Sequence, residues 1–252
     1  MKDDRAVLQG HLRDLANRAD RGGVFCFSDF LGLAEQNVYR EMERELSYAA
    51  VCAYGGAEQT ERVVLRFGDP EELGYELPFP IVTLKITPRA PKFAECLTHR
   101  DVLGSLMNLG ITRDTLGDIV IREGEIYLFC LDRVADFIME NLTRIRHTDV
   151  KIETVEQLPE GSLYRVQTVK IQAVGERLDA IVAKVYRISR DDALLLFTRG
   201  LVFQNGRCVE SHAKPPKEGD IISVRGHGRF RYVGFVSETR KGKMNLVVEQ
   251  YV

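Results

Sequence analysis

The chain has 252 residues, a formal net charge of −2 at pH 7, 44% hydrophobic residues and 29% charged residues. This length is enough for two or three small domains with their own cores, and the composition is ordinary for a water-soluble protein. No apolar run approaches the roughly 20 residues that span a bilayer, and the charged N-terminal stretch lacks an apolar signal core. The five scattered cysteines include no C-x-x-C pair, which argues against a zinc ribbon or a disulfide framework. We therefore expect a cytoplasmic protein without a membrane partner.

Residues 1–79 predict a small N-terminal α/β domain. Leucines at helical spacing predict a helix over residues 1–20, and Val38, Met42 and Leu46 predict a second helix over residues 34–48. The β-like runs AVCAYGG and RVVLRFG follow, and the turn-rich stretch GDPEELGYELPFP ends the pattern.

Residues 80–160 alternate strand and helix patterns. IVTLKITP predicts a strand, THRDVLGSLMNLG a helix, DIVIREGEIYLFCL a hairpin around Glu123-Gly124, DRVADFIMENLTRI a helix and HTDVKIETVEQL a last strand. The order β-α-β-β-α-β is the ferredoxin-like arrangement of RRM-type RNA binders. We expect an RRM-like middle domain.

The third strand of this domain carries two aromatic residues, Tyr127 and Phe129, which lie two apart and therefore share one face. In RRM domains, aromatic residues within an Arg/Lys-Gly-aromatic signature stack on bases. No glycine-aromatic signature precedes the pair here. Two interpretations stay open, namely that the pair stacks on bases or that it belongs to the core.

The charge is distributed unevenly along the chain. From Glu176 to Val252 there are fourteen Lys/Arg and nine Asp/Glu, a balance of +5, which leaves −7 for the first 175 residues. A basic C-terminal part on an acidic body indicates a polyanionic partner that binds one end of the protein.

The C-terminal region predicts two short helices and a hairpin. Leu178, Ile181, Val182 and Val185 give the first helix an apolar face, and Ala193, Leu196 and Phe197 do the same for the second. Ser189 is placed to cap the second helix in a capping box with Asp192, and Gly200 to end it. Asn205-Gly206, between LVFQ and RCVE, is the strongest short signal for a hairpin turn. Further along, EGDIISVRGHGRF predicts a turn at Gly219-Asp220, a strand and a Gly-x-Gly bend, before a terminal β-hairpin.

The run RLD…SRDDALLLFTRGLVFQNGRCV…EGDIISVRGHGRF resembles the S4 RNA-binding domain. The resemblance covers residues 177–230 and implies a C-terminal S4 domain at residues 161–252, with its core at 176–236. Helix starts and loop ends are where phosphates reach such a scaffold. The side chains expected to contact RNA are Arg177, Asp179, Ser189, Arg190, Arg199, Asn205, Lys214, Arg225 and Arg229.

We expect Arg177 and Arg190 to start the two helices, with the Arg190 guanidinium free to form a bidentate pair with phosphate. Their substitution by alanine would then weaken RNA binding and leave the fold intact, since surface substitutions usually change stability by less than about 0.5 kcal/mol. The alternative is that these arginines only solvate the surface or pair with Asp179 and Asp191.

The stretches LTHRDVLGSLMNLGITRDTLGDIVI, ADFIMENLTRI and VRGHGRF are similar to the bacterial YlmH family. This resemblance implies an α+β protein of three small domains, an N-terminal domain, an RRM-like middle and a C-terminal S4 domain. It also implies binding to rRNA and tRNA on the large ribosomal subunit, in ribosome quality control of stalled peptidyl-tRNA complexes. We expect the protein to be a monomer.

Two other classes of function stay open. S4 domains also occur on pseudouridine synthases and RNA methyltransferases, but ERLD at residues 176–179 opens the S4-like region itself, and too few residues follow for a synthase domain. No glycine-rich loop follows a predicted strand, and the histidines show no metal-ligand spacing. We therefore expect no catalytic residue, no cofactor and no metal. The second class is a protein-interaction adaptor that acts through the acidic N-terminal domains.

Overall fold

The computed structural model describes residues 2–122, 124–156, 158, 164, 166–239 and 242–251, without the side chains of residues 2, 3 and 93. The chain forms two compact units, Met1–Leu163 and Tyr164–Val252, called here the first unit and the second unit. Helices combine with antiparallel strand pairs, so the fold class is α+β, as predicted. The predicted boundary at residues 160 and 161, and the predicted turn residue Glu123, lie outside the described residues.

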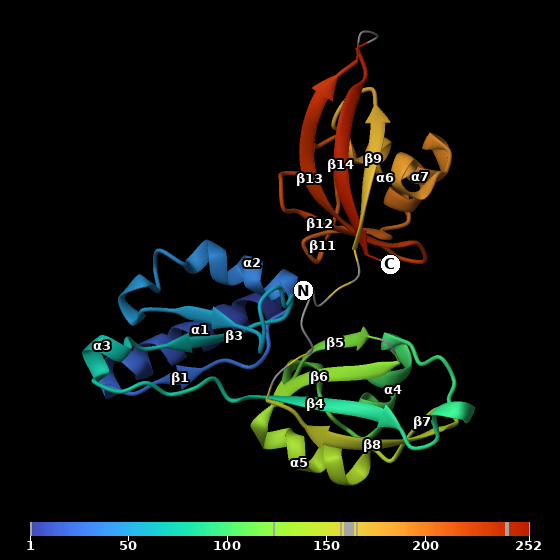
Figure 1. The fold of residues 1–252 in the computed structure, drawn as a ribbon. Coiled ribbons are helices and arrows are strands. Elements are labelled where there is room, and N and C mark those ends of the chain that lie inside the picture. Colours follow the sequence, from blue (N-terminus) through green and yellow to red (C-terminus); the bar gives the residue numbers. More distant parts are fainter. Residues whose placement is uncertain are drawn as a thin grey trace. The chain divides into compact units, whose positions relative to one another are not determined.

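The first unit begins with two helices on a small sheet (Figure 1). Helices α1 (Lys2–Gly22) and α2 (Leu33–Met42) pack with the sheet β1-β3-β2, formed by Cys26–Phe27, Val64–Phe67 and Cys52–Tyr54. The prediction of a helix over residues 34–48 is wrong at its C-terminal end. Helix α2 ends at Met42, and the 3-10 turn η1 (Ser47–Ala49) follows, with Ala50 in the left-handed region (φ 44°). Leu46 is fully buried, but it enters the core from this turn.

The rest of the first unit is a five-stranded sheet with two helices on one face. After the short helix α3 (Pro70–Leu73), the chain order is β4 (Ile81–Pro88), α4 (His99–Asn108), β5 (Leu116–Arg122), β6 (Glu125–Leu131), α5 (Asp132–Asn141) and β8 (Thr148–Thr154). This is the β-α-β-β-α-β order that the sequence predicts, and the strands lie in the order β5-β6-β4-β8-β7. The two 3-10 turns η2 (Pro91–Phe93) and η3 (Arg113–Thr115) precede α4 and β5. The second helix ends earlier than predicted, because Arg144–Ile145 forms the strand β7, which turns back onto β8.

One face of this sheet packs against its helices. Ile126, Leu128 and Cys130 share a core with residues of α4 and α5. Successive side chains of a strand point to opposite faces, so Tyr127 and Phe129 lie on the other face of β6. That face is buried too, since Tyr127 is 3% exposed and Phe129 is fully buried.

Residues that precede β4 cover this second face. A Cβ added at Gly56 would lie 2.4 Å from the Phe129 ring, and a Cβ added at Gly117 of β5 would lie 2.8 Å from the Phe30 ring. The structure therefore decides between the two interpretations of the aromatic pair. Tyr127 and Phe129 are core residues and are not available to stack on bases.

A partly buried guanidinium, that of Arg62, reinforces this packing. Arg62 donates from Nε to the Leu116 carbonyl (2.8 Å) and from Nη2 to the carbonyls of Phe30 (2.9 Å) and Arg113 (3.1 Å). The Asp118 carboxylate accepts hydrogen bonds from the backbone amides of Glu61 and Arg62. Burial, together with the Arg62 charge, lowers the pKa of Arg113 to about 10. These contacts make the α1–β3 part and the five-stranded sheet a single packed body.

The second unit is built on a six-stranded sheet with two helices against it (Figure 1). Its elements are β9 (Val166–Ala173), α6 (Leu178–Tyr186), α7 (Arg190–Thr198), β10 (Val202–Gln204), β11 (Arg207–Cys208), β12 (Ile221–Val224), β13 (Gly228–Glu238) and β14 (Met244–Tyr251). The strand order is β11-β10-β12-β13-β14-β9. The apolar faces of α6 and α7 share one core with Val224, Phe230 and Leu246 of the sheet.

The predicted turns of this unit are confirmed. Asn205 (φ 49°) and Gly206 (φ 76°) connect β10 to β11, in which Gln204 pairs with Arg207. Positive φ at both central residues is the requirement of a two-residue type I′ turn. The long terminal hairpin β13–β14 is also present. Strand β9 was not predicted, because only Ile171 and Ala173 along it are buried.

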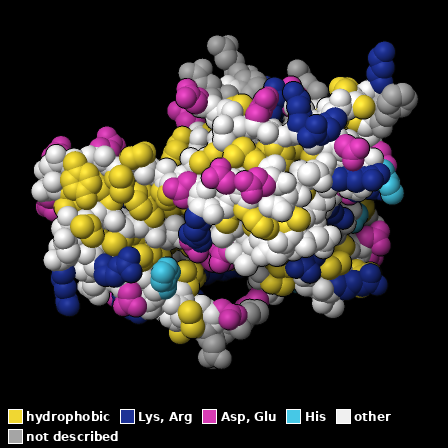
Figure 2. All heavy atoms as spheres, turned by 90° about the horizontal axis from the view of Figure 1, so that it is seen from below, with side chains coloured by type: hydrophobic (Ala, Val, Ile, Leu, Met, Phe, Trp, Pro, Cys, Tyr) yellow, Lys and Arg dark blue, Asp and Glu magenta, His cyan; other side chains and the backbone are white. Residues whose placement is uncertain are grey.

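Among the described helices, none combines the length and the apolar composition that crossing a bilayer requires. On the face of the molecule that Figure 2 displays, charged side chains of both signs are mixed with apolar ones.

Replacing Gly56 by alanine should destabilise the first unit, because the new Cβ meets the buried Phe129 ring and the residue has φ 100°. Overpacking and left-handed backbone strain each cost roughly 1–3 kcal/mol. Thermal unfolding should therefore show that the free energy of unfolding falls by about 2–4 kcal/mol. Gly110→Ala is the matched control, since Gly110 also has a positive φ (83°) but has open space around its Cβ position. Equal losses in the two variants would contradict the packing described for this face.

Candidate nucleic-acid interface

The start of α6 places a carboxylate inside the second unit. Leu178, Ile181 and Val182 turn into the core, and this fixes how the helix lies on the sheet. Asp179 follows Leu178 and has a fully buried position, and its backbone amide donates to the His212 carbonyl (3.2 Å). A buried carboxylate is costly unless charged donors compensate it.

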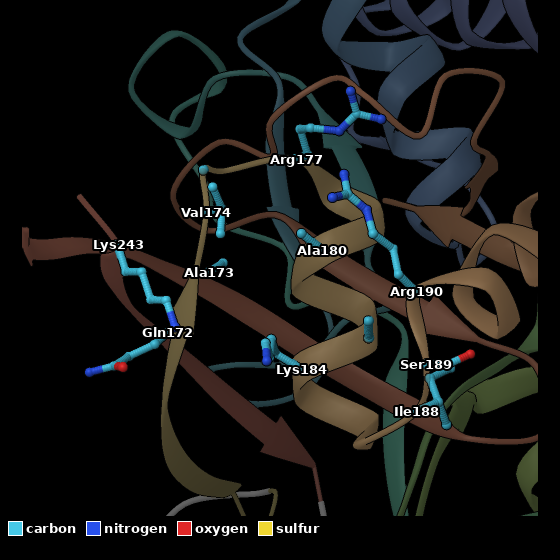
Figure 3. A pocket seen from close by; sticks show the side chains of 12 residues that line it. Gln172, Ala173, Val174, Arg177, Ala180, Lys184, Ile188, Ser189, Arg190 and Lys243 are labelled. Carbon is cyan, nitrogen blue, oxygen red and sulfur yellow. The ribbon is translucent and has the colours of Figure 1, made fainter. Parts of the chain in front are cut away.

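Two arginines provide that compensation. Arg177, the N-cap residue of α6, donates from Nε to Oδ1 of Asp179 (3.0 Å) and from Nη2 to Oδ2 (3.2 Å). Arg190, the first residue of α7, donates to Oδ2 of Asp179 from Nε (3.2 Å) and from Nη2 (3.1 Å). We call Arg177 and Arg190 the arginine pair. Figure 3 shows their guanidinium groups close together beside α6.

The expectation that the Arg190 guanidinium is free is wrong, and the alternative of pairing with Asp179 is confirmed, because Asp179 holds both guanidinium groups. The side chains of Arg177 and Arg190 are nevertheless 45% and 54% exposed, against 1% for Asp179. Each guanidinium has five N–H donors, so donors remain on its outer edge. One carboxylate and two guanidinium groups leave a net charge of +1 that faces solvent.

Asp179 stays ionised in this arrangement. Burial alone would raise the pKa of Asp179, but hydrogen bonds from Arg177 and Arg190 and their positive charges outweigh it, and the pKa lies below its usual value. The same carboxylate raises the pKa of Arg177 by hydrogen bonding and by its charge. Because Asp179 is buried, it positions the arginines and does not itself reach a ligand in solvent.

The start of α7 is fixed by a capping hydroxyl. Ser189 caps α7 as predicted, since its hydroxyl oxygen accepts a hydrogen bond from the Asp192 amide (3.0 Å). The predicted capping box is not formed, because the Asp192 carboxylate accepts from the Ser189 hydroxyl (2.7 Å) and not from the Ser189 amide. Upstream, Arg187 ends α6 in the left-handed region (φ 55°), which turns the chain into α7. Arg190 is therefore placed beside Asp179 by two local backbone features.

A pocket of about 380 Å³ lies over α6, and we call it the α6 pocket. It is lined by the end of β9, by α6, by Ile188–Arg190 and by Lys243, which precedes β14. Figure 3 shows Lys243 and Gln172 on one side of α6 and Ile188 and Ser189 on the other. The pocket brings the arginine pair together with two cations that the sequence-based candidates did not include, Lys184 and Lys243. Lys184 follows the candidate Arg177 by seven residues, about two helical turns, and this spacing could have identified it.

Three other candidate residues lie outside the α6 pocket. Asn205 binds within the fold, since its side chain donates to Asp220 (2.7 Å) and accepts from the Ile221 amide (2.9 Å). Arg199 is the exposed C-cap residue of α7, and Lys214 is exposed in the loop that follows β11. Asn205 therefore has a structural role, whereas Arg199 and Lys214 face solvent.

Arg225 and Arg229 stand on either side of the Gly-x-Gly bend, against aromatic rings. The Arg225 guanidinium lies 4.6 Å from the centre of the Phe203 ring, and that of Arg229 lies 4.3 Å from the centre of the Tyr251 ring and 5.2 Å from that of Tyr164. Such cation–π contacts hold a guanidinium in place while it keeps its charge. The arrangement can present oriented cations to a polyanion.

Comparisons with known proteins add family information. Residues 76–158 match a family model described as "Putative RNA-binding domain in YlmH". Over 228 residues the chain is 30% identical to the "Ribosome-associated protein quality control protein P2" of Bacillus subtilis (strain 168), a match that covers 88% of this chain and 86% of the relative. A solved structure titled "Cell division protein ylmH from Streptococcus pneumoniae" matches with a TM-score of 0.49 and 17% identity, over 60% of this chain and 91% of that one.

Replacing both members of the arginine pair by alanine should destabilise the second unit, contrary to the expectation from the sequence. The buried Asp179 carboxylate would lose both charged partners, which costs on the order of 3 kcal/mol. Urea unfolding at pH 7 should show this loss, and adding Asp179→Asn should recover most of it because no buried charge then remains. If the double and triple variants were equally stable, the role given to Asp179 would be wrong.

Proposed function

The chain belongs to the YlmH family, and from this premise we propose that it is a non-enzymatic RNA-binding protein of ribosome quality control. Its RNA is ribosomal RNA and tRNA on the large ribosomal subunit, where stalled peptidyl-tRNA is processed. The protein acts in the cytoplasm as a monomer and needs no cofactor. The name of the Bacillus subtilis relative supports the ribosome-associated role.

The single observation that carries the proposal is the α6 pocket with its cations. Arg177, Arg190, Lys184 and Lys243 line it, and its described lining contains no acidic residue. Charged donors held in fixed positions suit phosphate, and arginine in particular binds phosphate in a bidentate manner. Electrostatic contacts of this kind supply most of the affinity of RNA-binding surfaces and make it depend on salt.

We assign RNA binding to the second unit, as an S4 domain. Two short capped helices, the Asn-Gly hairpin and the Gly-x-Gly bend occur there in the order that the S4 resemblance implies. The assignment uses Arg177, Ser189 and Arg190 at the α6 pocket, with Arg199, Lys214, Arg225 and Arg229 as further contacts. Asp179 and Asn205 support these contacts from inside the fold.

The domain division proposed for the chain is 1–79, 80–160 and 161–252. The strand order β5-β6-β4-β8 supports an RRM-like assignment for the middle domain, since it is the order of a ferredoxin-like sheet. The face of that sheet carrying Tyr127 and Phe129 is closed. RNA contacts of the middle domain, where the family model matches, therefore use its loops or its helices.

Binding of an RNA hairpin by the full chain should weaken steeply as salt rises, with a log–log slope of several units. In an Asp179→Asn background, which removes the buried charge, replacing Arg177 and Arg190 by alanine should lower the slope by about one for each phosphate that is no longer neutralised. Fluorescence anisotropy over a salt series measures this, and sedimentation with purified large subunits tests the ribosomal partner.

Arg13→Ala is the matched control, because Arg13 is an exposed arginine of the first unit outside the residues that match the family model. It should bind with the slope of the parent chain, and Asp179→Asn alone is the reference for the triple variant. A flat salt response of the parent, or identical binding with and without the arginine pair in the Asp179→Asn background, would refute the proposed function.

A further inference from the structure

We propose that the α6 pocket accepts a single unpaired nucleotide of the RNA, with the base on an apolar floor and its flanking phosphates on the surrounding cations. This inference rests on the RNA-binding function proposed above and names the part of the RNA that the site selects. Three features of the pocket support it: the floor, the charged rim and the size.

The floor of the pocket is made of small apolar side chains. Ala180 and Ala183 lie three residues apart on α6 and therefore on one face of the helix, and Ala173 adds to them from the end of β9. Ile188 and Val174 extend the apolar lining, and Val174 is 80% exposed. An apolar surface offers no hydrogen bond or charge to a phosphate. The face of a base, in contrast, packs favourably on apolar side chains. The floor therefore fits a base.

The rim of the pocket carries the charge. The arginine pair lies at the start of α6, Lys184 lies further along the same helix, and Lys243 comes from the segment before β14 (Figure 3). The cations thus come from separate elements around the floor. A nucleotide within a chain has a phosphate on each side, so cations at more than one place on the rim can pair with both. Gln172 adds an amide, which can both donate to and accept from the edge of a base.

The size of the pocket limits what enters it. At about 380 Å³ it lies near the lower end of the 300–1,000 Å³ that ligand pockets occupy, so it suits one nucleotide and not a stacked series. A base inside a duplex must leave its stack to enter such a site, and this cost is least for a base that is already unpaired. The site should therefore select a bulge, a loop or a strand end over a continuous duplex.

The test uses the full chain and three RNA hairpins of equal stem sequence, one fully paired, one with a single bulged nucleotide and one with an abasic residue at the bulge. The bulged hairpin should bind about tenfold more tightly than the paired one, in line with the burial of one base against apolar side chains, and the abasic hairpin should lose that advantage. A free mononucleotide, added as competitor, should displace the bulged hairpin poorly, because it lacks the second phosphate.

Two variants at the floor provide the matched comparison. Ala180→Leu fills the pocket with a good helix-forming residue, and it should remove the preference by weakening binding of the bulged hairpin more than binding of the paired one. Ala180→Ser stays small and should keep the preference. The RNA comparison requires no variant, so it decides the question even if Ala180→Leu folds poorly.

The outcomes separate this inference from the proposed function. Equal binding of the bulged and abasic hairpins would overturn the base pocket and leave RNA binding by the cations in place. An equal loss of affinity for all three hairpins in Ala180→Leu would make the pocket a phosphate site only. Strong displacement by the mononucleotide would assign the pocket to a free nucleotide. Absence of binding to any hairpin would overturn both proposals.

Discussion

The second unit depends on one buried carboxylate. Asp179 sits inside the fold at the start of α6, and its burial requires the guanidinium groups of Arg177 and Arg190, which lie two and eleven positions away in the sequence. The same three side chains therefore connect the beginnings of both helices and orient the cations at the α6 pocket. Stability and the proposed RNA binding are coupled here, since removal of the arginines also leaves a charge buried without a partner.

In the first unit, one face of the five-stranded sheet packs inside the protein and is not exposed to a ligand. An RRM-type domain presents an aromatic sheet face to RNA, but here Tyr127 and Phe129 are buried beneath residues that precede β4. Arg62 uses its donors on the backbone carbonyls of Phe30, Arg113 and Leu116, which fixes the covering residues to the sheet. This face of the sheet is therefore an internal packing surface.

Local patterns in the sequence predicted much of this fold, and the misses have a common physical cause. The Asn205-Gly206 turn and the Ser189 cap depend on residues within a few positions of one another, so the sequence carries their full signal. Strand β9 was missed because few of its side chains are buried. The second helix was predicted to extend too far, because Leu46 keeps helical spacing although it lies beyond the end of α2.

The sequence-based candidates contained the arginine pair, but they also included Asp179 as an RNA contact, since burial at a helix start depends on tertiary packing. Lys243 was missed because it joins the pocket only through the pairing of β14 with β9.

The central claim is that RNA is bound by the second unit at the α6 pocket and not on the sheet of the first unit. Photo-crosslinking of the full chain to RNA that contains 4-thiouridine, with the crosslinked peptides mapped by mass spectrometry, tests this claim most directly. We predict crosslinks within residues 172–190, with further ones near Arg225 and Arg229. Crosslinks on β6 at Tyr127 or Phe129, with none in residues 172–190, would contradict it.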